Sequence, residues 1–187
     1  QTLPSIVRML IAMREVDTFA TNGYGGWDQN GNGVFRSFAD QLLDVGNDVV
    51  DARGGGWRPV LDQHGFEKDI FDLGLTRLAD LSEYLPADRH LIHEDTLNYN
   101  VVVRNNRISG IFDWGTAMWG DAVYDLAWFR FWNPWYPQWS ELNIPDYLER
   151  EVGIIGNRQE ERMQCCLIHI GLMHIRYNAF IGNLVAM

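Results

Sequence analysis

Lysine is almost absent from this chain of 187 residues, since Lys68 is the single one and the formal net charge is −10. Nucleic acids and anionic membrane surfaces attract proteins that carry clustered basic side chains. The charge balance therefore argues against both as partners and favours a cationic one. No apolar run approaches the roughly 20 residues of a membrane-spanning helix, so no membrane partner is expected.

Cysteine is also scarce, because the chain has only Cys165 and Cys166. A disulfide between neighbours would be strained, so two free thiols in a reducing compartment, the cytoplasm, are expected. Cys165 and His169 could both face one side of a helix, but no residues at a recognisable spacing supply the other ligands of a zinc site. Apolar residues make up 47% of the chain, which is enough for one domain with a substantial core.

The most informative run extends from His93 to Asn100 and reads HEDTLNYN, and DWG follows at 113–115. The first pattern is H-x-D-x-x-x-x-N and the second is D-x-G. Enzymes that transfer phosphoryl groups use this spacing to place a base and a Mg²⁺ ligand on one loop and a second ligand at D-x-G. The H-x-D pattern alone fits a buried hydrogen-bonded pair as well as a catalytic site, and D-x-G alone is usually a turn. Together they predict a kinase-like catalytic loop.

The residues between the two motifs predict a β-hairpin. Residues 100–104 are rich in β-branched side chains, Asn105-Asn106 suits a two-residue turn, and residues 107–112 can form the returning strand. The hairpin would bring the asparagine of the first motif and the aspartate of the second to the same end. Their oxygen atoms suit a hard cation.

With these motifs the chain resembles the aminoglycoside phosphotransferases, which share the protein-kinase fold, and most of all those of the hygromycin type. The resemblance is carried by HEDTLNYN, IFDWGTAMWGDAVYDLAWF and FWNPW, and a weaker likeness covers nearly the whole chain, including IGLMHIRYNAFIGN near the end. It implies an α+β, mainly helical fold. This fold is the carboxy-terminal lobe of a kinase, in which a small β-hairpin carries the catalytic loop and the metal ligands.

The resemblance also implies roles for individual residues. Asp95 would be the catalytic base, and Asn100 and Asp113 would be the Mg²⁺ ligands. His93 would orient the loop, and Asp121 would be the buried acid that braces it through hydrogen bonds.

One position departs from the family pattern. Glu94 stands where the family usually has glycine or another small residue. We expect its carboxylate to face solvent, although it could instead perturb the pKa of Asp95 through like-charge repulsion.

An aromatic cluster follows the motifs. Trp128 is expected in the core, whereas Trp132 and Trp135 flank Asn133-Pro134 and could wall a substrate cleft, since ammonium groups bind over tryptophan faces. The candidate substrate contacts are Trp132, Trp135, Asn98 and Asp125.

Apolar residues at helical spacing predict helices over residues 4–17, 34–45, 69–85, 122–132 and 157–178, and Ile144-Pro145-Asp146 begins another. The glycines of residues 23–33 are expected in a surface loop with no β-hairpin around them. No strand carries a phosphate-binding lysine, because Lys68 reads as the start of a helix. Residues 1–187 are therefore expected to be a single domain, the catalytic and substrate lobe, without the amino-terminal ATP lobe.

The expected function is phosphoryl transfer from ATP or GTP, with Mg²⁺, to a hydroxyl of a small cationic or polyhydroxylated substrate, an aminoglycoside or aminocyclitol. The chain alone would be inactive or weak without its amino-terminal lobe. Two alternatives stay open: a kinase for choline, homoserine or a sugar, and a non-catalytic kinase-like binding module. The intact set of Asp95, Asn100 and Asp113 argues against the module.

Overall fold

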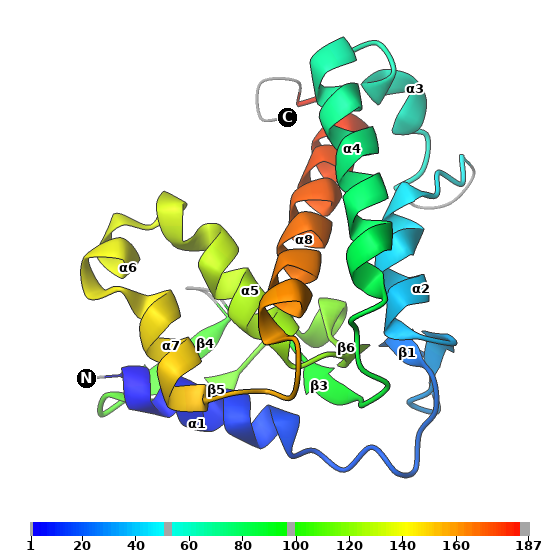
Figure 1. The fold of residues 1–187 in the computed structure, drawn as a ribbon. Helices are drawn as coiled ribbons and strands as arrows, with labels where there is room; N and C mark the ends of the chain where they lie inside the picture. The colour runs from blue at the N-terminus through cyan, green and yellow to red at the C-terminus, as the bar shows by residue number, and fades with distance from the viewer. Residues whose placement is uncertain (1, 51–53, 97–99, 184–187) are drawn as a thin grey trace.

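The computed structural model describes residues 2–50, 54–96 and 100–183 and is mainly helical, with two small antiparallel sheets (Figure 1). Its helical segments are α1 (Leu3–Arg14), α2 (Phe38–Leu43), η1 (Asp44–Gly46), α3 (Arg58–Leu61), α4 (Gly65–Ser82), η2 (Trp114–Thr116), α5 (Val123–Trp132), η3 (Asn133–Trp135), α6 (Pro137–Leu142), α7 (Ile144–Val152) and α8 (Gln159–Ile181). Its strands are β1 (Tyr24–Trp27), β2 (Gly33–Phe35), β3 (His90–Ile92), β4 (Val101–Arg104), β5 (Arg107–Ile111) and β6 (Met118–Gly120). The α+β prediction is confirmed.

The hairpin predicted between the two motifs is present as β4 and β5, which pair from Arg104 opposite Arg107 to Val101 opposite Ile111, with a register shift between Val102 and Val103. Both turn residues are left-handed, with φ of 51° at Asn105 and 58° at Asn106, the conformation that a two-residue hairpin turn requires. A second sheet has the strand order β2-β1-β6-β3, so β6, which follows the D-x-G motif, pairs with β3, which leads into the catalytic loop. The two motifs are thus joined both by the hairpin and by the sheet.

The expectation of a plain loop at residues 23–33 was wrong, because β1 and β2 pair there as an antiparallel hairpin. Gly23 has φ of +72°, and a Cβ on it would lie 2.2 Å from the carbonyl oxygen of Gly33. Glycine is therefore needed for the close approach of the two strands. The other neighbour of β1 is β6, where Gly25 pairs with Trp119 from a distant part of the chain.

The helix expected over residues 34–45 was half wrong. Phe35 is extended and pairs with Tyr24, and the helix α2 begins only after Ser37. The Ser37 hydroxyl accepts a hydrogen bond from the Asp40 N–H at 3.0 Å, which is a standard N-cap. The other predicted helices correspond to α1, α4, α5, α7 and α8, with ends that differ by a few residues.

Helix α5 lies at the centre of the fold, and residues 123–129 are all buried. Helices α4 and α8 run side by side, and α8 also packs on α5, while α1 crosses below β3 and β5 (Figure 1). Helix α1 thus packs against the two strands, β3 and β5, that lead into the two motifs. Within the described ranges, no helix is both long and apolar enough to cross a membrane.

Candidate active site

His93, the first residue after β3, is fully buried and fixes the loop to the D-x-G segment. Its Nδ1 accepts a hydrogen bond from the Asp95 N–H at 3.2 Å, so the ring proton belongs on Nε2, which lies 2.8 Å from the carbonyl oxygen of Phe112. The Trp114 ring packs edge-on against it at 4.6 Å between centroids. His93 therefore holds the loop on one side and the residue before Asp113 on the other.

The side chain of Asn100 is turned towards Asp95. Its Nδ2 donates to Asp95 Oδ2 and to the Asp95 carbonyl oxygen, both at 2.8 Å. These bonds use the amide nitrogen, so the amide oxygen is directed elsewhere. The Asn100 carbonyl oxygen accepts from the Phe112 N–H at 2.8 Å, which places the start of β4 beside the D-x-G motif.

Asp113 follows Phe112 directly and is exposed, in a left-handed conformation with φ of 55°. Both polar backbone groups of Phe112 are bonded to the catalytic loop, at His93 and at Asn100, so Asp113 directly follows a residue that is fixed to this loop. The Asn100 amide and the Asp113 carboxylate are hard oxygen donors, which is the ligand chemistry that Mg²⁺ prefers.

Outside residues 1, 51–53, 97–99 and 184–187, no group of three or more His, Cys, Asp and Glu side chains is arranged to hold a metal ion. Mg²⁺ usually keeps several waters and takes further oxygens from substrate phosphates, so two protein ligands fit it.

The role that the resemblance assigned to Asp121 belongs to Asp125. The Asp125 carboxylate accepts the backbone N–H of His93 at 3.2 Å and of Glu94 at 2.9 Å, and it is 3% exposed. Burial raises the pKa of Asp125 to about 6 despite these two bonds. In the part of the chain that the structure describes, Asp121 instead binds the Arg162 guanidinium and the Val123 N–H, so it ties α5 to α8.

The expectation that Glu94 faces solvent was wrong, because it is only 8% exposed. Burial raises the pKa of Glu94 to about 8, and the negative charges of Asp125 and Asp95 raise it further, while a hydrogen bond from the Tyr124 hydroxyl at 3.4 Å lowers it. Its backbone is left-handed, with φ of 72°. A glycine would adopt this conformation without strain, which accounts for the small residue usual at this position in the family.

A pocket of about 980 Å³ opens beside Asp95, and we call it the loop pocket. Its walls come from the catalytic loop, from η2, from α5 and from the last turns of α8. The residues that line it are Gly54, Glu94, Asp95, Thr116, Trp128, Trp132, Met173, His174, Arg176, Tyr177, Phe180 and Ile181. A carboxylate in the lining of a pocket that also contains several aromatic side chains is suited to bind a small molecule.

The structure separates the candidate substrate contacts. Trp132 lines the loop pocket, whereas Trp135 is 62% exposed, stacks on Phe131 at 5.5 Å and is not part of the lining. Asp125 lies beneath the loop rather than in the pocket, and Asn98 lies outside the described residues. Sequence reasoning missed the wall formed by α8, although residues 173, 177, 180 and 181 recur at helical spacing and could have indicated it.

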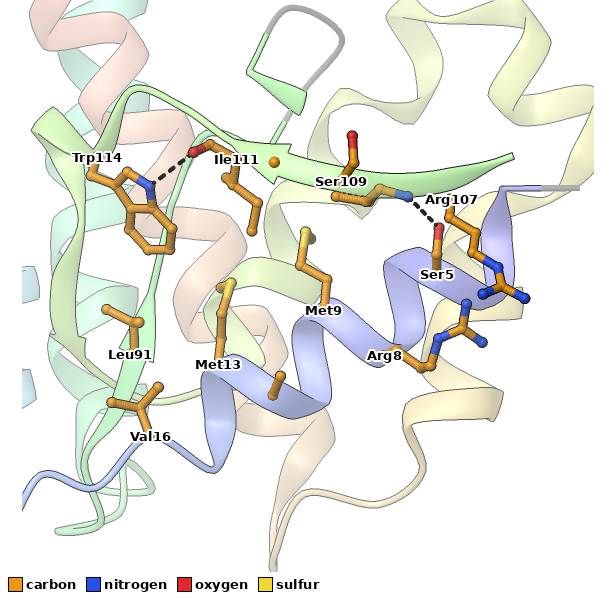
Figure 2. A pocket seen from close by; sticks show the side chains of 13 residues that line it. Ser5, Arg8, Met9, Met13, Val16, Leu91, Arg107, Ser109, Ile111 and Trp114 are labelled. Atoms are coloured by element: carbon orange, nitrogen blue, oxygen red, sulfur yellow. Dashed lines mark hydrogen bonds between the residues drawn. The ribbon is translucent and has the colours of Figure 1, made fainter. Parts of the chain in front are cut away.

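A second hollow, of about 820 Å³, lies between α1 and β5 (Figure 2). Met9 and Met13 of α1 face Ile111 across it, Trp114 closes one end, and Arg107 stands at the other. The Ser5 hydroxyl joins the two elements by accepting the Ile108 N–H at 3.0 Å. This hollow contains neither Asp95 nor Asn100, so the loop pocket is the candidate substrate site.

In this structure an aspartate is hydrogen-bonded to the asparagine five residues later, and a D-x-G aspartate follows at the base of the hairpin. This is the arrangement of a kinase-like catalytic lobe, which is the class of protein that the fold and site define. The chain belongs to the phosphotransferase enzyme family, whose sequence pattern matches residues 6–162.

Among known proteins, the chain is similar to hygromycin-B 4-O-kinase from Escherichia coli, with 26% identity over 185 residues. The match covers 97% of this chain and 50% of that protein, so the chain spans about half the length of its relative. It is also similar in structure to aminoglycoside phosphotransferase APH(4)-Ia, with a TM-score of 0.80 and 25% identity over 99% of this chain and 59% of that one. A thermostable mutant of APH(4)-Ia in ternary complex with AMP-PNP and hygromycin B matches with a TM-score of 0.78 and 25% identity, again over 99% and 59% of the two chains.

Proposed function

We propose that this chain is the catalytic lobe of an ATP- and Mg²⁺-dependent phosphotransferase that acts on a hydroxyl group of an aminoglycoside or aminocyclitol. The observation that carries the proposal is the Asp95 carboxylate, which Asn100 holds at the edge of the loop pocket. The relatives named above act on or bind hygromycin B, and this supports the substrate class.

In this proposal Asp95 accepts the proton of the substrate hydroxyl and orients the oxygen towards the phosphorus atom. Asn100 and Asp113 hold Mg²⁺, which neutralises phosphate charge when it is bound. His93 and Asp125 keep the backbone of the loop in place, His93 through its ring and Asp125 through two N–H groups. Trp132 and the last turns of α8 form the wall against which the sugar rings pack.

We also propose that residues 1–187 form one domain and that a separate amino-terminal lobe supplies the ATP-binding lysine. The single lysine of the chain, Lys68, pairs with Asp72 on α4 at 2.7 Å. Another residue or segment must therefore bind the phosphates of the nucleotide in an active enzyme.

The experiment is a measurement of ADP release with Mg²⁺-ATP and a panel of aminocyclitols that includes hygromycin B. The chain would be compared with a version extended by its upstream coding region. We expect substrate-stimulated release from the extended protein and little from the chain alone. Asp95→Ala should lower turnover by several orders of magnitude, as for the loss of a catalytic base, while the exposed control Asp80→Ala should not change it. A fully active Asp95→Ala protein would remove the proposed base, and an extended protein inert with every acceptor would refute the aminocyclitol proposal.

A further inference from the structure

Glu94 is a buried carboxyl group that lines the loop pocket, and no cationic side chain among the described residues is paired with it. Its one hydrogen bond among the described residues comes from the neutral hydroxyl of Tyr124, at the long distance of 3.4 Å. The same hydroxyl is closer to His169 Nδ1, at 2.8 Å. A buried carboxylate normally has a cationic partner or several strong donors, so the Glu94 side chain retains unused capacity to accept.

The backbone conformation of Glu94 is also energetically unfavourable. A side chain at φ of 72° is strained, whereas glycine would not be. The chain thus combines a strained backbone with an uncompensated buried acid at one residue, directly before Asp95. Strain of this kind persists where the surroundings hold it, and it concentrates at ligand sites.

The rest of the pocket suits a cationic ligand. Trp128, Trp132, Tyr177 and Phe180 contribute aromatic rings to its lining, and cations bind favourably over such faces. The basic side chain in the lining, Arg176, lies with its guanidinium 5.8 Å from the Trp57 ring centroid, where it already has a cation–π partner. Burial lowers the pKa of His174, which favours its neutral form.

We propose that Glu94 binds a cationic nitrogen of the acceptor substrate and so makes the enzyme prefer cationic over neutral acceptors. The inference rests on the proposed function for the identity of the acceptor, and it deepens that function by naming a specificity-determining residue. The ligand chemistry is a protonated or quaternary ammonium group on a hydroxylated small molecule.

Proton release should accompany binding of such a cation. Among the described residues, the titratable and charged groups near the Glu94 carboxyl or in the pocket lining with it are Asp95, Tyr124, Asp125, His169, His174, Arg176 and Tyr177. With its pKa raised to about 8, Glu94 holds a proton at pH 7 in the free protein. An ammonium group beside the carboxyl favours the ionised form and expels that proton. Affinity for a quaternary ammonium ligand, which cannot itself titrate, should therefore rise with pH up to about 8 and then level off.

The test measures by calorimetry how tightly three ligands bind to the full chain. The ligands are an aminocyclitol, its N-acetylated counterpart and its quaternary ammonium derivative. Glu94→Gln removes the charge at nearly constant shape. Glu94→Gly is the second variant, which also relieves the backbone if the glutamine protein folds poorly. Glu15→Gln, at an exposed position after α1, is the control for loss of one negative charge.

In the wild type and in Glu15→Gln, the amine should bind about tenfold to a hundredfold more tightly than its N-acetylated counterpart, as for a charge-assisted contact. The quaternary ligand should release close to one proton at pH 7, measured in two buffers of different ionisation enthalpy. Both effects should disappear in the Glu94 variants. An equal preference in wild type and Glu94→Gln, or weak binding of all three ligands to the wild type, would overturn the inference. The ADP-release assay decides the proposed function separately, because turnover of any acceptor supports that function whether or not Glu94 selects it.

Discussion

Two buried acidic sites stand near the beginning of α5, and they are built in opposite ways. Asp121, fully buried, is paired with the guanidinium of Arg162, which is itself only 3% exposed. Glu94 and Asp125, also buried, have neutral donors and each other as neighbours, and burial raises the pKa of both. The first site has its charge balanced within the fold. The second lies beneath and beside the catalytic loop, and its two carboxyl groups have no cationic partner among the described residues. Raised pKa values of this kind are common at functional sites. The following variants test this difference, from the largest expected effect to the smallest.

Arg162→Met should have the largest effect, because it leaves the Asp121 carboxylate buried without its partner. We expect a loss of about 3–5 kcal/mol in the free energy of unfolding, measured by urea denaturation at pH 7. Arg150→Met, in a surface pair that is 65% exposed on the arginine side, should cost about 0–1 kcal/mol. Equal losses in the two variants would show that the buried pair has no special role.

Glu94→Gln should change the pH dependence of stability. Since the pKa of Glu94 is raised to about 8 in the folded protein, the folded state holds this proton more tightly than the unfolded state does. The stability from Glu94 is therefore fully present below its ordinary pKa of about 4.5 and is lost as pH rises to about 8, by about 1.4 kcal/mol per pH unit. Urea denaturation at pH 5, 6, 7 and 8 should give a flatter profile for the glutamine variant. Parallel profiles would mean that Glu94 does not titrate abnormally.

Asp125→Asn should weaken both the fold and the loop. An amide has one acceptor oxygen, so one of the N–H groups of His93 and Glu94 would face an NH₂ group and lose its partner. We expect a loss of about 1–3 kcal/mol in unfolding free energy and lower turnover in the ADP-release assay. The exposed control Asp80→Asn should change neither, and unchanged turnover in Asp125→Asn would remove its proposed role in positioning the loop.

The smallest effect concerns the backbone at residue 94. Glu94→Gly and Glu94→Ala both remove the carboxyl, but only glycine relaxes at φ of 72°. The glycine variant should be more stable than the alanine variant by about 1 kcal/mol, measured by denaturation at pH 5, where the acid is neutral in the wild type. Equal stability of the two variants would show that the left-handed conformation is not strained in solution.

Features that depend on neighbours in the sequence could be predicted. The β4–β5 hairpin followed from the β-branched run and from Asn105-Asn106, and the placement of Asp95 and Asn100 on one loop followed from their spacing. Each of these depends on interactions between residues that are near one another in the chain.

Features that depend on distant segments could not be predicted. Strand β1 pairs with β6 through Gly25 and Trp119, which no local pattern indicates. Glu94 is buried because Tyr124 and Asp125 of α5 lie against the loop, and the pocket wall is built by α8. The Asp121 role was misplaced for the same reason, since its partner Arg162 is 41 residues away.

Helix α8 contacts both acidic sites along its length. Arg162 lies near its first turn, His169 touches Tyr124 at its middle, and Tyr177 and Phe180 form the pocket wall near its end. Its 23 residues span about 34 Å. Helices α4 and α5 pack against α8 between these two ends. The ion pair that balances the charge of Asp121 and the wall of the loop pocket therefore belong to one continuous helix.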